Sequence, residues 1–195
     1  HLIRADIARH RGDISAAKTM FGQFEIDQLN PLEWAWLWLN PPPVSQIDVG
    51  GDSDMGYIRG CYLGEGDAAL DATFRWCRTE MQLRFPQAAS GFVQRVVLRV
   101  DGRVWPADVP PAHHIDVWLG NQRIGTMAAD DRRVRDEVFD LPIIPMGSDI
   151  VITLRGPEFV PDAHDFRMQQ GILAGQVRRL MVRLDDARVV AATTP

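Results

Sequence analysis

Residues 92–100 read Phe92-Val-Gln-Arg-Val-Val-Leu-Arg-Val100. Val96, Leu98 and Val100 occupy alternate positions, and successive side chains of an extended strand point to opposite faces. This two-residue period predicts a β-strand with one face in the core. Further segments follow the same pattern: Asp71–Arg78, Met81–Phe85, Ile115–Leu119, Glu137–Leu141, Ile150–Arg155 and Val177–Leu184.

Turn signals such as Asp101-Gly102 and Met146-Gly147-Ser148 separate these segments, and no long helical pattern lies between them. Short strands joined by turns favour an antiparallel β-sandwich over a parallel sheet covered by helices. The Gly120-Asn121 pair is typical of a two-residue hairpin turn and predicts that residues 115–119 pair with residues 122–127. The expected fold class is therefore mainly β, an antiparallel β-sandwich.

The first 43 residues follow a helical period instead. Apolar side chains recur there every three or four residues, Gly12 supplies a stop, and Asp13 stands where a helix cap belongs. A last helix is expected to begin at Asn30-Pro31 and to end before Pro41-Pro42-Pro43. We therefore expect a helical annex at residues 1–43, followed by the sandwich domain at residues 44–195. Some indoles of Trp34, Trp36 and Trp38 are expected to meet that domain, because they cannot share one helix face.

Charge and hydropathy argue against nucleic acid as a partner and against a membrane-spanning segment in this chain. The chain has 195 residues and a net charge of −5, with 21 basic and 26 acidic side chains and no basic run. The chain therefore lacks the cluster of basic residues with which proteins bind the phosphates of nucleic acids. The densest apolar stretch, residues 34–39, is too short to cross a bilayer. Because the chain begins at His1 without an initiator Met, we expect it to be a piece of a longer protein.

Catalytic and metal-binding motifs are weak. The chain has no Gly-x-Ser-x-Gly elbow, no His-Glu-x-x-His and no phosphate loop. His113 and His114 are adjacent, so on a strand they would face opposite ways. The loop around His164, residues 161–165, is rich in oxygen ligands but matches no known calcium loop, which favours a solvated loop over a calcium site. We expect neither a cofactor nor catalysis, and an esterase or glycosidase on this scaffold has little support.

Cys61 and Cys77 are the only cysteines. If residues 60–64 pair with residues 74–77 as a hairpin, the two can lie opposite each other and form a disulfide in an oxidising compartment. A shift of one residue would instead leave two separate buried thiols. Because the disulfide requires one exact strand register, we favour the two separate thiols.

Four residues form the candidate ligand-binding cluster: Tyr62, Glu65, Arg75 and Trp76. Glu65 and Arg75 lie near facing ends of the expected hairpin and could form an ion pair flanked by aromatic rings. Such a cluster could hold a sugar ring and accept hydrogen bonds from its hydroxyls. It could equally be a structural clamp that fixes the hairpin on the sandwich. Aromatic residues serve more often in cores, which favours the clamp.

Several motifs resemble a known family: Ile47–Glu65, Phe74-Arg75-Trp76, Phe159-Val-Pro161 and Asp165-Phe-Arg167. They are similar to the C-terminal soluble domain of bacterial multi-pass membrane glycosyltransferases of the dolichyl-phosphate-mannose mannosyltransferase type. The resemblance implies a galactose-binding-like or jelly-roll sandwich with no catalytic residue. It also implies that the stretch around Gly12-Asp13 is the tail of a tetratricopeptide-like helical array.

From this resemblance we expect a non-catalytic accessory domain at the extracytoplasmic face of a bacterial membrane. It would bind carbohydrate or position a partner, while the transfer chemistry would belong to the membrane part of the parent chain. The alternative is a purely structural module for protein interaction. The location of Glu65, Arg75 and Trp76 relative to the surface distinguishes binding from clamping.

Overall fold

The computed structural model describes residues 31–51, 53–62, 65–67, 72–101, 114–128, 133–157 and 182–192, together with Ala8, Arg11, Asp13 and Ala16. For residues 65–67, 72, 101 and 182–185 it describes the backbone alone. The secondary structure elements of this part are one helix, α3 (Pro31–Trp38), and the strands β1 (Gln46–Asp48), β2 (Ile58–Cys61), β3 (Glu65–Asp67), β4 (Ala72–Phe85), β5 (Gln94–Asp101), β6 (His114–Leu119), β7 (Gln122–Ala128), β8 (Val134–Leu141), β9 (Ile150–Arg155) and β10 (Val182–Ala191).

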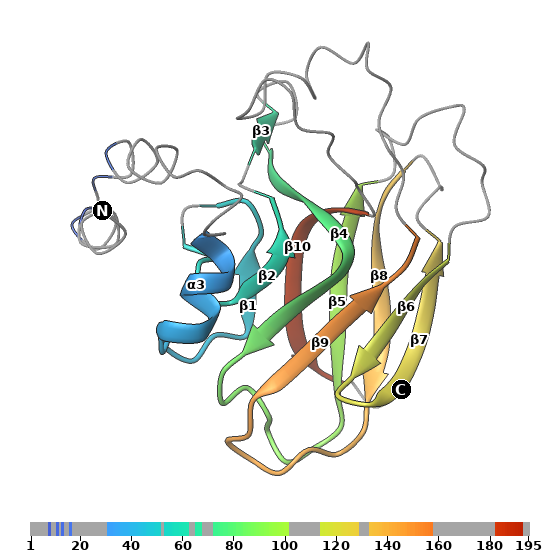
Figure 1. The fold of residues 1–195 in the computed structure, drawn as a ribbon. Helices are drawn as coiled ribbons and strands as arrows, with labels where there is room; N and C mark the ends of the chain where they lie inside the picture. Colours follow the sequence, from blue (N-terminus) through green and yellow to red (C-terminus); the bar gives the residue numbers. More distant parts are fainter. Residues whose placement is uncertain are drawn as a thin grey trace.

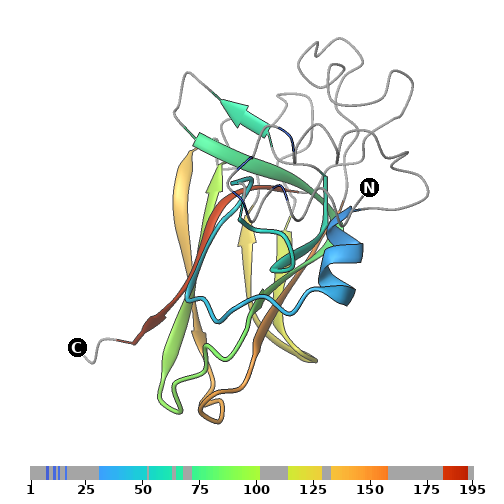
Figure 2. The same ribbon diagram turned by 90° about the vertical axis from the view of Figure 1, so that its left-hand side faces the viewer.

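The strands form two antiparallel sheets, one of five and one of four strands, and the sheets pack as a sandwich (Figure 1). The five-stranded sheet has the order β7-β6-β9-β4-β2, and the four-stranded sheet has the order β1-β10-β5-β8. The tenth strand, β3, pairs with the first residues of β4. The two sheets join at one end, where the start of β10 pairs with the first half of β4. This confirms the expected fold class. Figure 2 shows the two layers from the side.

The core lies between the two sheets and follows the alternation in the sequence. Val96, Leu98 and Val100 of β5 point inward, and so do the apolar side chains at alternate positions of β4 and β9. Burial of each large aliphatic side chain contributes about 1.5–3 kcal/mol to folding. Leu32 and Ala35 of α3 belong to the same core, so this helix is packed as part of the sandwich. The division at residue 43 stays a prediction.

Several predicted elements are confirmed. Strand β9 covers Ile150–Arg155 as expected, and β6 and β7 pair as the predicted hairpin around Gly120. Helix α3 begins at Pro31 and ends before the prolines. The Asp13 carboxylate accepts a hydrogen bond from the backbone N–H of Ala16 at 3.1 Å, as a helix cap does. The rest of the expected helical hairpin lies outside the described residues.

Other boundaries differ from the prediction. The segments 71–78 and 81–85 form one strand, β4, because the polar residues between them lie in continuous strand conformation. Strand β10 extends to Ala191, beyond the expected end at Leu184, and residues 177–181 lie outside the described part. The short strands β1 and β3 were not predicted. No helix among the described residues is both long enough and apolar enough to span a bilayer.

Candidate functional site

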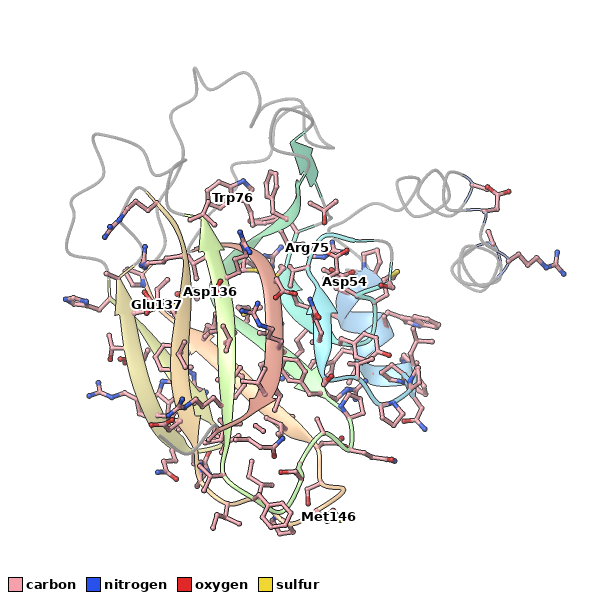
Figure 3. All side chains as sticks on the ribbon, turned by 180° about the vertical axis from the view of Figure 1, so that it is seen from behind. Asp54, Arg75, Trp76, Asp136, Glu137 and Met146 are labelled. Carbon is pink, nitrogen blue, oxygen red and sulfur yellow. A yellow bond between two sulfur atoms is a disulfide. The ribbon has the colours of Figure 1, made fainter. Side chains whose placement is uncertain are left out.

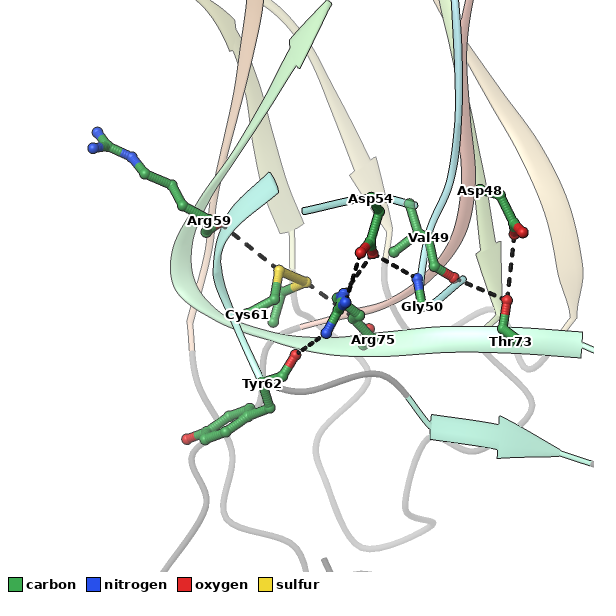
Figure 4. A network of polar contacts seen from close by, with 10 residues as sticks. Asp48, Val49, Gly50, Asp54, Arg59, Cys61, Tyr62, Thr73 and Arg75 are labelled. Carbon is green, nitrogen blue, oxygen red and sulfur yellow. Dashed lines mark hydrogen bonds and ion pairs between the residues drawn. A yellow bond between two sulfur atoms is a disulfide. The ribbon is translucent and has the colours of Figure 1, made fainter. Parts of the chain in front are cut away.

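Arg75 is held in a buried ion pair, and its partner is Asp54 rather than the expected Glu65. The Arg75 Nε and Nη2 atoms donate to the two Asp54 carboxylate oxygens at 2.5 and 2.6 Å, which is the bidentate geometry. Nη1 donates to the backbone carbonyl of Tyr62 at 2.9 Å, and the backbone N–H of Gly50 donates to Asp54 at 2.8 Å. Figure 4 shows this network joining the loop before β2 to β4.

Cys61 and Cys77 form a disulfide beside this ion pair. The expectation of separate thiols was therefore wrong. The two residues lie directly opposite each other because the strands shift register at Gly60. Gly60 has a positive φ of 77°, and a Cβ there would lie 2.3 Å from the carbonyl oxygen of Glu80, so only glycine fits. This register shift could not be read from the sequence pattern.

Two of the four predicted ligand-binding residues, Arg75 and Trp76, are buried. Trp76 is 4% exposed and packs edge-on against Phe74, and Arg75 is 5% exposed. Tyr62 is half-buried, and its ring extends away from Asp54 (Figure 4). The backbone of Glu65 pairs with Phe74, while its side chain lies outside the described residues. The burial of Arg75 and Trp76 supports the clamp interpretation for these two residues.

A second group of aromatic residues lies on the outer face of the five-stranded sheet. Each ring has an arginine guanidinium carbon near it: Arg78 lies 5.0 Å from the Tyr62 ring centroid, Arg155 lies 5.3 Å from Trp118, and Arg59 and Arg84 lie 5.0 and 4.7 Å from Trp36. Proteins show about one such pair per 70–80 residues, so four pairs are more than the average for a chain of this length. All four pairs lie on one face of the sheet, and this clustering is the reason to consider the face as a site.

The register of the strands shows that these residues share one face. Arg59 on β2 lies opposite Gln82 on β4, Gln82 lies opposite Thr153 on β9, and Thr153 lies opposite Trp118 on β6. Neighbouring strands are about 4.8 Å apart, so this row is about 14 Å long. We call this surface the arginine–aromatic face and define it by Trp36, Arg59, Tyr62, Arg78, Glu80, Gln82, Arg84, Asp116, Trp118, Arg123, Thr126, Thr153 and Arg155.

Polar contacts connect the rings across this face. Gln82 donates to the Thr153 hydroxyl at 3.1 Å, and Arg155 pairs with Glu80 at 2.9 Å. Asp116 accepts hydrogen bonds from Arg123 at 3.2 Å and from Thr126 at 3.1 Å. Thr153 is 3% exposed, so the hydroxyl that this face offers to a ligand is that of exposed Thr126, together with amide, carboxylate and guanidinium groups between the aromatic rings.

Two buried donors of this face lack partners among the described residues, namely Trp118 Nε1 and Arg84 Nε. A buried polar group without a hydrogen bond costs about 1–3 kcal/mol. Such groups are uncommon in folded proteins and often mark functional positions. Both donors adjoin an arginine–aromatic contact, which distinguishes this face from ordinary solvated sheet surface.

This face was not predicted as a site from the sequence. Its strongest local signal is the alternation of Arg78, Glu80, Gln82 and Arg84 along β4, which places four polar side chains on one side of a strand. The rings come from α3, from the residue after β2 and from β6, so only the order of strands brings them together. For metals, no group of three His, Cys, Asp or Glu side chains in the described ranges could hold an ion, and the loop around His164 lies outside them.

Comparisons with known proteins give distant structural similarities. No protein-family model and no curated protein sequence matches the chain. The C-terminal family 6 carbohydrate-binding module of a laminarinase from Zobellia galactanivorans is 8% identical, with 69% of this chain and 90% of that chain covered and a TM-score of 0.38. A family 35 carbohydrate-binding module from Clostridium thermocellum is 9% identical, with coverages of 69% and 91% and a TM-score of 0.39.

A family 35 module from an environmental isolate is 12% identical, with coverages of 70% and 93% and a TM-score of 0.40. The similarity of the chain to these carbohydrate-binding modules is distant. None of these findings connects it to a glycosyltransferase or identifies a parent protein.

Proposed function

We propose that the chain is a non-catalytic carbohydrate-binding module and that the arginine–aromatic face holds the glycan. The observation that carries this proposal is the row of rings and polar groups across one sheet face. A pyranose ring has apolar C–H faces and hydroxyl edges, so it suits a surface where indole and phenol rings alternate with hydrogen-bonding side chains. The row from Arg59 to Trp118 gives room for a short oligosaccharide.

The arginines on the rings do not prevent such binding. An exposed guanidinium over an aromatic ring is held by about 0.5–1 kcal/mol. Arg155 is roughly half-exposed and pairs with Glu80, which is exposed to the same degree, so it can move aside at little cost. Movement of Arg155 would uncover the Trp118 ring and bring a ligand oxygen within reach of the unpaired indole N–H.

The place of the module in a larger chain is a separate proposal. The disulfide supports a location outside the cytoplasm, because such bonds persist in oxidising compartments. The role as an accessory domain of a bacterial membrane glycosyltransferase, and the positioning of a partner, rest on the sequence resemblance alone.

Binding to an array of bacterial and plant polysaccharides tests the proposed function. We expect at least one ligand with millimolar-range affinity, as is common for small polar ligands with few contacts. Trp118→Ala should lower this affinity at least about tenfold, since it removes the ring contact and the indole donor. The matched control is Trp38→Ala. Trp38 is 73% exposed on α3 and points away from Trp36, so its loss should leave affinity unchanged.

Equal losses in the two variants would contradict the proposed site. Absence of binding to every polysaccharide would overturn the function and leave the structural alternative. For that alternative the chain offers exposed Phe92 and Met146, whose two loops are joined by backbone hydrogen bonds between Ala89 and residues Gly147 and Ser148.

A further inference from the structure

The arginine–aromatic face is positively charged, although the whole chain has a net charge of −5. Its described members include five arginines and two carboxylates: Arg59, Arg78, Arg84, Arg123, Arg155, Glu80 and Asp116. A positive surface on a negative protein concentrates anions there, because the field depends on local charge rather than on net charge.

The arginines of this face differ in how they are neutralised. Arg123 and Arg155 pair with Asp116 and Glu80. Arg59 and Arg78 have no carboxylate partner among the described residues and lie against aromatic rings instead. Arg84 donates to the backbone carbonyls of Leu39 and Gly56 at 3.2 and 2.8 Å. An aromatic ring or a carbonyl attracts a guanidinium but carries no net charge, so these three arginines form no ion pair in this part of the structure. The described carboxylate next to Arg59 is that of Glu33, which accepts a hydrogen bond from the backbone N–H of Gly60 at 2.8 Å.

We infer that the glycan of the arginine–aromatic face carries anionic groups along its chain. This inference rests on the proposed function and specifies its ligand class. Guanidinium groups bind carboxylate, sulfate and phosphate through paired N–H donors. Because each of the three arginines adjoins a ring, one sugar unit can lie against the ring while its anionic group meets the guanidinium. Neutral glycans would leave these charges without partners.

Ionic strength gives an independent expectation. Charges at an exposed surface are screened beyond about 8 Å at 0.15 M salt. An anionic glycan that meets Arg59 and Arg78 should therefore bind more weakly as salt rises, on the order of tenfold between 20 and 200 mM. A neutral glycan held by rings and hydroxyl contacts should show almost no dependence on salt.

The test uses the whole chain and polymer pairs that share a backbone and differ in charge. Suitable pairs are polygalacturonate and its methyl ester, carboxymethyl and hydroxyethyl cellulose, and sulfated, phosphorylated and unmodified dextran. Affinity gel electrophoresis at both salt concentrations should show tighter binding of a charged member by at least about tenfold. The three anionic groups distinguish carboxylate, sulfate and phosphate as the source of the charge.

Two double variants, one on each sheet, remove the same amount of positive charge from different surfaces. Arg59→Gln with Arg78→Gln should lower the affinity for the charged polymer by about tenfold or more and reduce its dependence on salt. Arg95→Gln with Arg188→Gln removes the same two charges from the four-stranded sheet and should have almost no effect. Both double variants should remain folded, because all four side chains are at least partly exposed.

Each possible result supports or overturns the inference. If neutral members bind as tightly as charged members and Trp118→Ala still abolishes binding, the charge inference is wrong and the proposed function stands. If no polymer binds, both fail. If single-stranded DNA binds as tightly as the charged glycans, or if the control double variant loses as much affinity, the attraction is a general one for polyanions and the inference is overturned.

Discussion

The outer faces of the two sheets differ in how some of their arginines are paired. On the four-stranded sheet, Arg188 donates to Asp136 at 2.5 Å and to Asp186 at 2.8 Å, and Arg95 pairs with Asp140 at 2.7 Å. The hydrogen bonds to Asp136 and then Asp186 raise the pKa of Arg188 above its ordinary value. On the arginine–aromatic face, Arg59 and Arg78 lie on rings instead. Figure 3 shows Asp136 on β8, on the side away from this face.

The difference shows how one residue type serves two purposes. An arginine paired with a carboxylate has its charge offset by that partner. Arg59 and Arg78 lie against aromatic rings and have no carboxylate partner among the described residues, so each combines a positive charge with a neighbouring apolar ring. The second arrangement is suited to a ligand with both apolar and anionic parts.

The buried Asp54–Arg75 ion pair should have the largest effect on stability when one partner is removed. Asp54→Asn leaves Arg75 buried without its counter-ion, and we expect unfolding free energy to fall by about 3–5 kcal/mol. Asp140→Asn on the other sheet removes an exposed partner and should cost at most about 1 kcal/mol. Urea unfolding of both variants measures the contrast. Similar small losses would show that the Asp54–Arg75 pair is not a clamp.

The disulfide should have the next largest effect. Replacing both Cys61 and Cys77 by Ala should lower the free energy of unfolding by about 2–4 kcal/mol, because the unfolded chain loses a constraint across 16 residues. Thermal unfolding with and without a reductant gives the measurement. The reductant should destabilise the natural chain and leave the double variant unchanged. A natural chain that is insensitive to complete reduction would contradict this account.

The smallest effect is expected on the four-stranded sheet. Asp136→Asn removes one partner of Arg188, and the change in unfolding free energy should stay within about 1 kcal/mol and shrink with salt. Glycan binding should not change, since Asp136 lies outside the arginine–aromatic face. A loss of affinity measured by titration would show that the two faces are not independent.

Much of the fold could be predicted from local pattern. The strict alternation of Ile150, Ile152 and Leu154 defines β9 because its inner side is wholly buried. Strand β10 was harder to place, because its register shifts between Leu184 and Asp186 and its outward positions carry the charges of Asp186 and Arg188. These charged residues alternate with buried Ala187 and Val189, so the segment has too few apolar residues to be recognised as a core strand from its sequence.

The site could be predicted only in part. Arg75 and Trp76 were singled out from the sequence, but Asp54 was missed because a pair separated by 21 residues depends on tertiary structure. The rings of Trp36 and Trp118 are far apart in sequence. They share a face only because β4 and β9 lie between β2 and β6, and no local pattern contains that order.

The central claim is that the glycan lies on the outer face of the five-stranded sheet, and the indole N–H signals of the tryptophans test it most directly. In a titration followed by ¹⁵N NMR with a glycan that binds, the signals of Trp118 and Trp36 should move. Those of buried Trp76 and of Trp38 should stay in place. Movement of the Trp76 or Trp38 signals with a stationary Trp118 would contradict the account.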